Sequence, residues 1–271
     1  MELERLVEKA TKGDQQALAG VVVAIQDDIY YLAVRMLVNP DDAKDATQEI
    51  LINVITKLST FEFKSLFKTW VYRVATNYLL NNKKMLAKEH GLTFEMYKAD
   101  LEADLEAAGE LQQLPDYPVL VNELRISCTM AMLLCLKQSH RMAYILGEIF
   151  ELDHVEASEI LSMSRDNYRK QLSRAREKVT SFTKTSCGLV SDDAKCDCQR
   201  KLNGAIRRGR IQPNQKIYSR FSDLNYIEVT NKIKETQKEL KTLVLQTSVS
   251  CCKSPVNFSD YLEELMTGEF C

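Results

Sequence analysis

Apolar residues recur every three or four positions along most of this 271-residue chain, which is the spacing of α-helices with one buried face. The clearest example is residues 41–58, where the apolar positions fall on one side of a helix: Ala43, Ala46, Ile50, Val54 and Leu58. Strand signals are sparse, and only five prolines and nine glycines interrupt the helical pattern. The pattern therefore predicts an all-α protein.

Helix start and stop signals divide the N-terminal part into four predicted helices, at 3–11, 14–38, 41–58 and 66–87. Gly13 suits the left-handed conformation that often follows a helix end, and Asp14 can cap the next helix. The sequence Asn39-Pro40-Asp41 is a turn, and a linker at 59–65 precedes the fourth helix. We expect these helices to form one small domain, residues 1–90.

An acidic segment, residues 91–122, follows this domain. From Glu95 to Glu123 eight acidic residues accompany a single base, Lys98. Prolines at 115 and 118 mark the end of the segment, as expected where one helical stretch gives way to another. The composition predicts a linker with room for one short helix.

Beyond the linker we expect a second helical domain, 123–184, and a C-terminal extension, 185–271. The extension begins with a cysteine- and arginine-rich stretch, 187–215, which we expect to be a loop. A helix at 222–247 is predicted by its periodic apolar residues: Ile227, Val229, Ile233, Leu240 and Val244. A short last helix follows, with Ser259 as its cap.

A helix-turn-helix pattern lies in the second domain. Asp153 and Glu156 form a predicted capping box, in which the second side chain reaches back to the cap. Residues 162–164 are a tight turn, and Ser164 can cap a second helix. The apolar face of that helix comprises Tyr168, Leu172, Ala175 and Val179. Its polar face comprises Arg165, Asn167, Arg169, Lys170, Ser173 and Arg174. Arginine and asparagine can make bidentate contacts with bases, so the pattern is typical of a recognition helix; a basic helical hairpin is the alternative.

Aromatic and basic residues interleave between positions 59 and 78: Phe61, Phe63, Lys64, Phe67, Lys68, Trp70, Tyr72, Arg73 and Tyr78. Aromatic rings can stack on unpaired bases while lysines follow the phosphate backbone. Trp70, Arg73 and Asn77 share one face of the predicted helix. The alternative for each aromatic residue is a place in the core, which we expect for Phe67.

A polar stripe runs along the preceding predicted helix: Asp42, Asp45, Gln48, Glu49 and Asn53. A solvated helix face is its simplest explanation, and a docking surface for a basic partner is the functional alternative.

Composition adds a charge separation to this picture. Apolar residues make up 45% and charged residues 27% of the chain, which is ordinary for a globular protein. The net charge is only −2, yet residues 165–210 contain thirteen Lys and Arg against five Asp and Glu. Such a basic block is a footprint for phosphate, and the weak net charge suits a protein whose hold on DNA depends on a partner. Unbroken apolar runs are too short to span a membrane and no secretory signal is visible, so we expect a cytoplasmic protein without membrane contact.

In the cytoplasm the eight cysteines are better explained as free thiols, metal ligands or redox switches than as structural disulfides. We expect Cys128 and Cys135, on an apolar helix, to lie in the core. The candidate metal ligands lie in polar sequence further along: Cys187, Cys196, Cys198, Cys251 and Cys252. Three or four thiolates could bind zinc or copper, but the spacing lacks regular CxxC pairs, so redox sensing and no role remain alternatives.

Four runs occur in a fixed order: Leu6-Val7-x-x-Ala10-x-x-Gly13-Asp14, Asp42-Ala43-x-Asp45-x-x-Gln48-Glu49, Phe67-Lys68-Thr69-Trp70-Val71-Tyr72-Arg73-Val74-Ala75-x-Asn77 and Gln171-Leu172-Ser173-Arg174-Ala175-Arg176-Glu177-Lys178. The first three resemble conserved region 2 of the extracytoplasmic-function (ECF) sigma factors, and the fourth resembles the end of their region 4. The resemblance covers roughly residues 1–184.

The resemblance implies a non-enzymatic initiation factor that needs no cofactor and acts with bacterial core RNA polymerase on promoter DNA. Asp45, Gln48, Glu49 and Asn53 would dock on the β′ clamp helices, and region 4 would meet the β flap. The 59–65 loop would capture a flipped base of the −10 element, with Phe61, Phe63 and Lys64 in it. Trp70, Arg73 and Asn77 would hold the non-template strand. The recognition helix would read the −35 element. The acidic linker would thread toward the active site and RNA exit path of polymerase. An anti-sigma factor is a further candidate partner.

Two departures from the family pattern limit what can be transferred. Leu136-Lys137-Gln138 stands where the family usually has Leu-Pro, and Arg165-Asp166-Asn167-Tyr168 replaces a valine-rich start of the recognition helix. The −35 sequence therefore cannot be taken from relatives. Two alternative functions remain: an autonomous helix-turn-helix regulator, and a metal or redox sensor whose helical domains serve only protein interactions.

Overall fold

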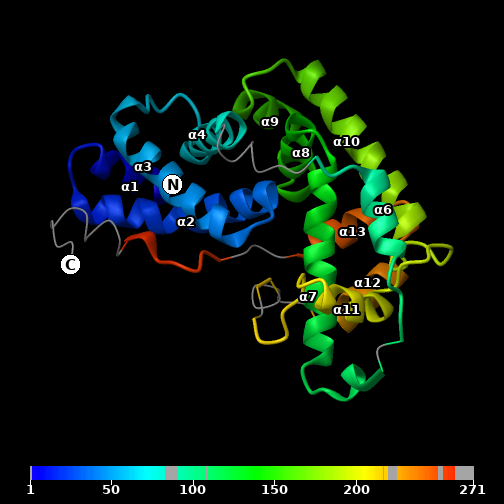
Figure 1. The fold of residues 1–271 in the computed structure, drawn as a ribbon. Coiled ribbons are helices and arrows are strands. Elements are labelled where there is room, and N and C mark those ends of the chain that lie inside the picture. Colours follow the sequence, from blue (N-terminus) through cyan, green and yellow to red (C-terminus); the bar gives the residue numbers. More distant parts are fainter. Residues whose placement is uncertain are drawn as a thin grey trace. The chain divides into compact units, whose positions relative to one another are not determined.

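The computed structural model describes residues 2–82, 91–107, 109–215, 217–218, 225–249 and 253–259 (Figure 1). The regular secondary structure in these ranges is helical, which confirms the all-α prediction. The β interactions in the same ranges are two isolated bridges, between Cys187 and Cys196 and between Gln212 and Gln215.

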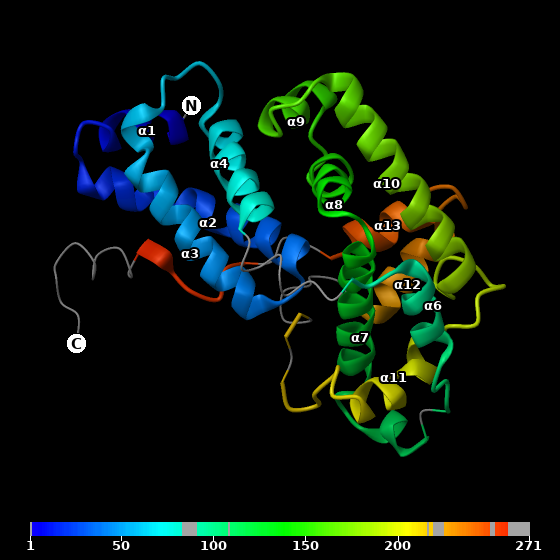
Figure 2. The ribbon, with the colours of Figure 1, turned by 45° about the horizontal axis from the view of Figure 1, so that its top comes forward.

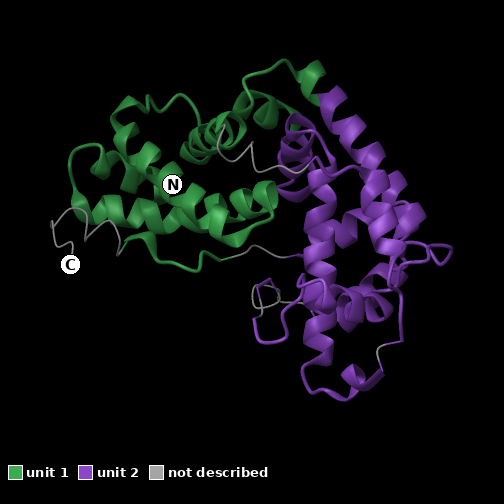
Figure 3. Ribbon diagram, viewed as in Figure 1, with its two compact units in different colours: residues 1–88, 153–168, 253–271 green, residues 89–152, 169–252 purple. Residues whose placement is uncertain are grey.

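The helices belong to two units (Figure 3). Unit 1 comprises residues 1–88, 153–168 and 253–271, and unit 2 comprises 89–152 and 169–252.

Unit 1 begins with the four predicted helices. These are α1 (Glu2–Ala10), α2 (Gln15–Leu37), α3 (Pro40–Thr56) and α4 (Phe67–Asn81). The Asp14 carboxylate accepts a bond from the Ala17 N–H at 2.9 Å, and the Asn39 side chain caps α3, where proline occupies the first position. Proline is favourable there because a backbone N–H at the first helical position would have no acceptor within the helix, so its absence costs no hydrogen bond. The fourth helix ends at Asn81, and the predicted end at 87 lies outside the described residues.

Unit 1 also contains the first helix of the helix-turn-helix, α9 (His154–Ile160), and the start of α10 (Arg165–Ser186). Residues 253–259 of the extension pack on α2, where the Ser254 N–H donates to Asp27 at 2.9 Å and the Phe258 N–H donates to Gln26 at 2.9 Å. Phe258 is 2% exposed. The helix predicted after Ser259 lies mostly outside the described residues.

Unit 2 contains the linker, the second domain apart from residues 153–168, and most of the extension. Its elements are α6 (Phe94–Glu102), η2 (Gly109–Gln113), α7 (Tyr117–Ala131), η3 (Met132–Cys135), α8 (Gln138–Tyr144), the π-helical η4 (Ile145–Ile149), the rest of α10, α11 (Cys198–Arg207), α12 (Tyr226–Glu235) and α13 (Lys241–Thr247). Both views show α11 beside α7 (Figures 1 and 2). The linker contains a short helix, α6, as predicted, but residues 91–122 also include η2 and the first residues of α7.

Two predictions for the extension are wrong. Residues 187–215 contain helix α11, because Asp197 caps the Arg200 N–H at 2.9 Å and Leu202 and Ala205 bury one face. The predicted helix at 222–247 is two helices, α12 and α13. It breaks at Thr236, whose backbone is extended (φ −81°, ψ 143°).

The extension shares a hydrophobic core with the second domain. Leu120, Val121 and Leu124 of α7 pack in one cluster with extension residues Leu202, Ala205, Ile211 and Tyr226. Buried polar groups join the same parts of unit 2: the Glu123 carboxylate accepts from the backbone N–H groups of Ile217 and Tyr218 at 2.8 Å. The extension up to residue 252 is therefore an integral part of unit 2.

Counted over 18-residue windows rather than unbroken runs, two segments within the described ranges are apolar enough to span a membrane, Gln15–Leu37 and Tyr117–Cys135. The fold buries 56% and 61% of these windows. Core helices of globular proteins meet the same criterion, so the two segments are weak evidence of membrane insertion.

Candidate nucleic-acid interface

Helix α10 presents the basic face that the sequence predicts. Tyr168, Leu172, Ala175 and Val179 are buried. The six polar residues on the other side are all exposed: Arg165, Asn167, Arg169, Lys170, Ser173 and Arg174. The predicted division of this helix into a buried and an exposed face is thus confirmed.

The turn before α10 fixes the start of that helix. The Asp153 carboxylate caps α9 by accepting from the backbone N–H groups of Val155 and Glu156, at 2.7 and 2.9 Å, and these bonds hold the pKa of Asp153 below its usual value. Ser162 adopts a left-handed conformation (φ 51°), and the Asn167 N–H donates to the Ser164 hydroxyl at 3.3 Å. The second half of the predicted capping box differs, because the Glu156 carboxylate accepts a bond from the Thr69 hydroxyl at 3.0 Å.

The aromatic residues near position 61 form one cluster in unit 1. Phe61 is only 6% exposed, and its ring centre lies 4.7 Å from that of Phe63, 5.3 Å from Phe67 and 5.5 Å from Trp70. Phe63 is 46% exposed and has a left-handed backbone (φ 56°), which is costly for a bulky residue. The loop therefore presents Phe63 on a platform of buried rings, while Phe61 faces the interior.

Helix α4 places the other predicted strand-binding residues on one side. Trp70 and Arg73 are half-buried and Asn77 is exposed. The Arg73 guanidinium donates to Glu159 of α9 at 2.9 Å. Lys64, in the loop, pairs with Glu62 at 2.5 Å, and both side chains are largely exposed.

The polar stripe lies along one side of α3. Asp45 and Glu49 are exposed, Gln48 and Asn53 are half-buried, and the Asn53 amide donates to the Glu49 carbonyl at 2.7 Å. Burial raises the pKa of the Tyr78 phenol, and the negative charges of Glu49 and Asp45 add to that effect. A negative surface is therefore available to a basic partner.

The cysteines lie differently from the prediction. Cys128 and Cys135 are half-buried rather than in the core, and the Tyr97 hydroxyl contacts the Cys128 sulfur at 3.0 Å. Cys128 lines one cavity of about 260 Å³ together with Cys196 and Cys198. Sequence reasoning missed Cys128 as a partner of the tail cysteines, because it lies about 70 residues before Cys196 and Cys198 in the sequence and no spacing rule could have found it.

Burial dominates the chemistry of these thiols. It raises the pKa of Cys187 to about 12 and that of Cys128 and Cys198 above the usual value, and neighbouring thiols add to the effect at Cys187 and Cys198. Among the described residues no group of three or more His, Cys, Asp or Glu side chains has an arrangement suited to a metal ion. Two of the predicted ligands, Cys251 and Cys252, lie outside the described residues.

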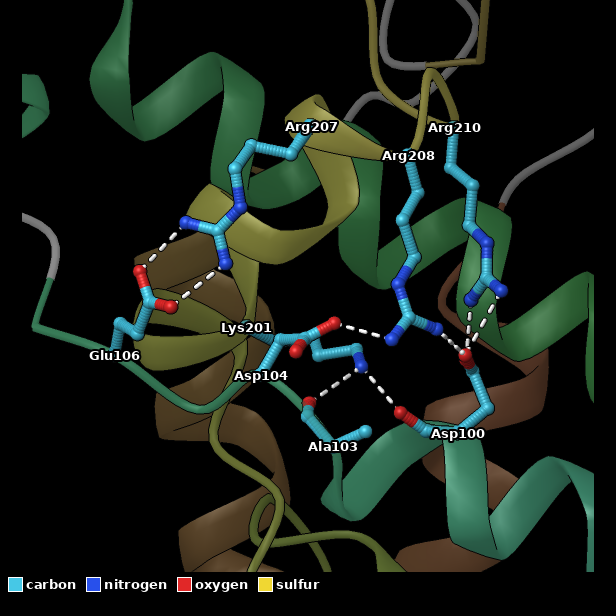
Figure 4. Close-up of polar contacts among 8 residues, drawn as sticks. All are labelled: Asp100, Ala103, Asp104, Glu106, Lys201, Arg207, Arg208 and Arg210. Atoms are coloured by element: carbon cyan, nitrogen blue, oxygen red, sulfur yellow. Dashed lines mark hydrogen bonds and ion pairs between the residues drawn. The ribbon is translucent and has the colours of Figure 1, made fainter.

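The basic block is partly neutralised within the protein. Figure 4 shows Arg207, Arg208 and Arg210 of the extension paired with linker carboxylates, and these arginines belong to the block that we interpreted as a phosphate footprint. The exposed basic residues of α10 are a separate set. The phosphate-binding interpretation therefore applies to α10, while the arginines after α11 bind the linker.

Comparison with known proteins gives three further observations. The sigma-70 region 2 family model matches residues 21–88. The ECF RNA polymerase sigma factor SigW of Bacillus subtilis is 29% identical over 182 residues, which cover 66% of this chain and 95% of SigW. The ECF RNA polymerase sigma-E factor of Escherichia coli (strain K12) is 31% identical over 176 residues, which cover 64% of this chain and 90% of that protein.

Among solved structures, that of CnrH in complex with the cytosolic domain of CnrY is similar in 65% of this chain and 94% of the other, with 17% identity and a TM-score of 0.46.

Proposed function

Because this chain belongs to the ECF family of RNA polymerase sigma factors, we propose roles in initiation for its individual surfaces. The protein is a sigma factor that directs promoter-specific transcription by bacterial core RNA polymerase, and it is not an enzyme. Sigma factors of this family bind core polymerase and promoter DNA and require no cofactor.

Region 2 has the role of opening the promoter. Phe63 projects from the 59–65 loop and is the residue best placed to stack on a flipped −10 base. The Phe61 ring supports it from below, and Lys64 contacts the phosphate backbone of the DNA. Trp70, Arg73 and Asn77 hold the non-template strand from one side of α4. Stacking on aromatic rings suits this task because every base has a π-face.

Region 4 has the role of reading the −35 element through α10. Arg165, Asn167 and Arg169 lie at the start of the helix, where major-groove recognition helices contact base edges. The remaining polar residues are Lys170, Ser173 and Arg174, which suit phosphate contacts. On polymerase, region 4 contacts the β flap.

Docking on the β′ clamp helices is the role of the α3 stripe, formed by Asp45, Gln48, Glu49 and Asn53. Two of these side chains are exposed carboxylates, which supports an ionic contact with a basic partner. An anti-sigma factor is a candidate third partner. The protein binds core polymerase in the cytoplasm. Binding of zinc or copper by the tail cysteines remains a prediction.

The observation that carries this proposal is that the exposed basic face of α10 and the aromatic loop of region 2 occur in one chain. An autonomous helix-turn-helix regulator would need the first feature but would leave the second unexplained.

Reconstitution with core polymerase tests the proposal. We expect core polymerase plus this protein to start transcripts from a subset of promoters in the genome of its host, and core polymerase alone to give none of them. Tight binding to the same duplex DNA without polymerase, with no specific transcript in its presence, would favour the autonomous regulator.

A further inference from the structure

The C-terminal extension binds the acidic linker in unit 2, over residues 100–107 (Figure 4). Lys201 of α11 is only 3% exposed, and its ammonium group donates to the backbone carbonyls of Asp100 and Ala103, the latter at 2.8 Å. A buried ammonium group needs such partners, because an unpaired charge in the interior is costly. The position of Lys201 therefore fixes the end of α6 and the first residues after it.

Further main-chain contacts continue along the segment. They are the bond from the Glu106 N–H to the Arg200 carbonyl at 3.0 Å and the bond from the Asn203 amide to the Ala107 carbonyl at 2.7 Å. A general attraction between acidic and basic chains would not select main-chain atoms in this way. The linker is thus bound in one register.

Ion pairs accompany these bonds. The Arg207 guanidinium binds Glu106 through two bonds of 2.6 and 2.7 Å, and Arg208 and Arg210 both bind the Asp100 carboxylate. Although burial pushes the pKa of Asp100 upward, the bond and charge of Arg210, with Lys201 and Arg208, outweigh it and hold this pKa below its usual value. Asp100 is therefore a carboxylate at neutral pH.

Gly204 allows α11 to approach the linker this closely. A Cβ atom at this position would lie 2.7 Å from the Cβ of Asp104 and 3.0 Å from its carbonyl oxygen. Real Cβ contacts are longer than the first of these distances, so any larger residue would push the helix and the linker apart.

We propose that the C-terminal extension is a clamp within the same chain, which holds residues 100–107 and must release them before the linker can enter core polymerase. This inference rests on the proposed function, since the linker needs to be free only if it threads toward the RNA exit path. The linker imitates nucleic acid in its charge, and guanidinium groups are suited to bind either. The linker therefore cannot be held by the extension and by polymerase at the same time. The affinity for core polymerase is reduced by the fraction of molecules in which the extension holds the linker.

Charge reversals in the full-length protein test the clamp. Glu106→Arg and Arg207→Glu each replace an attraction by a repulsion, and the double variant restores an ion pair in the opposite sense. Lys232→Glu is the matched control, because it makes the same charge change as Arg207→Glu in an exposed residue of α12 that lies outside the linker. Two quantities are measured: amide hydrogen exchange of residues 100–107 in the free protein, and affinity for core polymerase.

We expect both single variants to speed exchange in the segment. Arg207→Glu, which leaves the sequence of the linker unchanged, should also raise the affinity for core polymerase about threefold or more, in proportion to the strength of an exposed ion pair. The double variant should return exchange toward wild type, and Lys232→Glu should change neither quantity. Gly204→Ala should act in the same direction as the single reversals without any change in charge.

The outcomes separate the two proposals. Unchanged exchange in the single variants would show that the contact does not hold the linker, and faster exchange with unchanged affinity would show that the contact does not oppose polymerase. Either result overturns the clamp. Failure of the wild type and of every variant to bind core polymerase would instead overturn the proposed function, and the role of the clamp with it.

Discussion

Burial, and not an activating neighbour, sets the reactivity of individual cysteines in this protein. Cys135 and Cys187 each have a pKa of about 12, because burial penalises the thiolate. The thiolate is the form that reacts with electrophiles and binds metal ions. Rapid redox or metal chemistry at these residues would therefore need the surrounding structure to open first.

Alkylation rates provide a direct check at this scale. At pH 7.5 we expect iodoacetamide to label Cys187 about 1000-fold more slowly in the native protein than in urea, since a pKa near 12 leaves only a trace of thiolate. The sign follows from the raised pKa: the thiolate fraction, and with it the labelling rate, should still be rising above about pH 10.5, where an ordinary thiol has levelled off. Mass spectrometry of the Cys187 peptide gives the rate, and fast labelling at pH 7.5 would contradict the buried thiol.

Residue identity predicted some of the site but not how the residues lie. The aromatic cluster near position 61 was visible in the sequence, whereas the division into buried Phe61 and exposed Phe63 depends on a left-handed backbone at Phe63 that no local pattern indicates. The grouping of Cys128 with Cys196 and Cys198 depends likewise on the packing of α11 against α7. Contacts between residues far apart in sequence follow from tertiary structure, so single-sequence patterns could not supply them.

At the level of elements, α10 separates packing from recognition. Its apolar residues are buried, so substitutions on its polar face should leave the fold intact.

Arg169→Ala combined with Lys170→Ala should therefore weaken promoter recognition and not stability. Loss of a base-reading arginine costs about 1–3 kcal/mol and relaxes the preference for one sequence, while loss of a phosphate contact weakens all sequences alike. Binding of the reconstituted holoenzyme to wild-type and mutated −35 sequences measures both effects. Lys178→Ala, exposed on the same helix about two turns further on, is the control. Equal binding and equal preference in the double variant would place recognition on another face.

Helix α4 has a comparable division. Trp70→Ala and Asn77→Ala should impair strand opening more than binding to core polymerase, because both residues lie on one side of α4 and Asn77 is exposed. Permanganate footprinting of the start region reports unpaired thymines. Lys12→Ala, at an exposed position outside the aromatic and basic set of residues 59–78, is the control. Normal melting by the Trp70 variant would mean that its ring serves the aromatic cluster alone.

The sequence predicted the helices of the first domain well and those of the extension poorly, for a physical reason. Asp14 and Asn39 are side-chain caps adjacent to strongly periodic apolar runs, so local signals and packing agree there. In the extension, α11 depends on a short apolar face that becomes stable only when it packs in a tertiary cluster with α7, Ile211 and Tyr226. Thr236 breaks a pattern that remains periodic across the break.

For the molecule as a whole, the extension has a structural role besides the clamp that we propose. Gln246 of α13 is buried and donates to the Thr129 carbonyl of α7 at 3.4 Å, and Arg125 donates to Ser248 at 2.7 Å. These contacts and the shared apolar cluster make the second domain dependent on residues that no sigma-factor motif covers. The family resemblance therefore describes the surfaces for DNA and polymerase but not what holds unit 2 together.

Removal of residues 187–271 should consequently destabilise unit 2 instead of releasing an independent region 4. It would expose Leu120, Val121 and Leu124, each worth about 1.5–3 kcal/mol when buried, against a typical total stability of 5–15 kcal/mol. It would also leave the Glu123 carboxylate without the N–H groups that it accepts from. We expect a lower Tm or aggregation, measured by thermal unfolding and light scattering. Removal of residues 250–271 alone is the control, because it loses the contacts of residues 253–259 with α2 but keeps Gln246 and Ser248, so the further loss of Tm in the longer deletion belongs to unit 2. A soluble 1–186 fragment with the Tm of the full chain would show that the extension contributes nothing to this core.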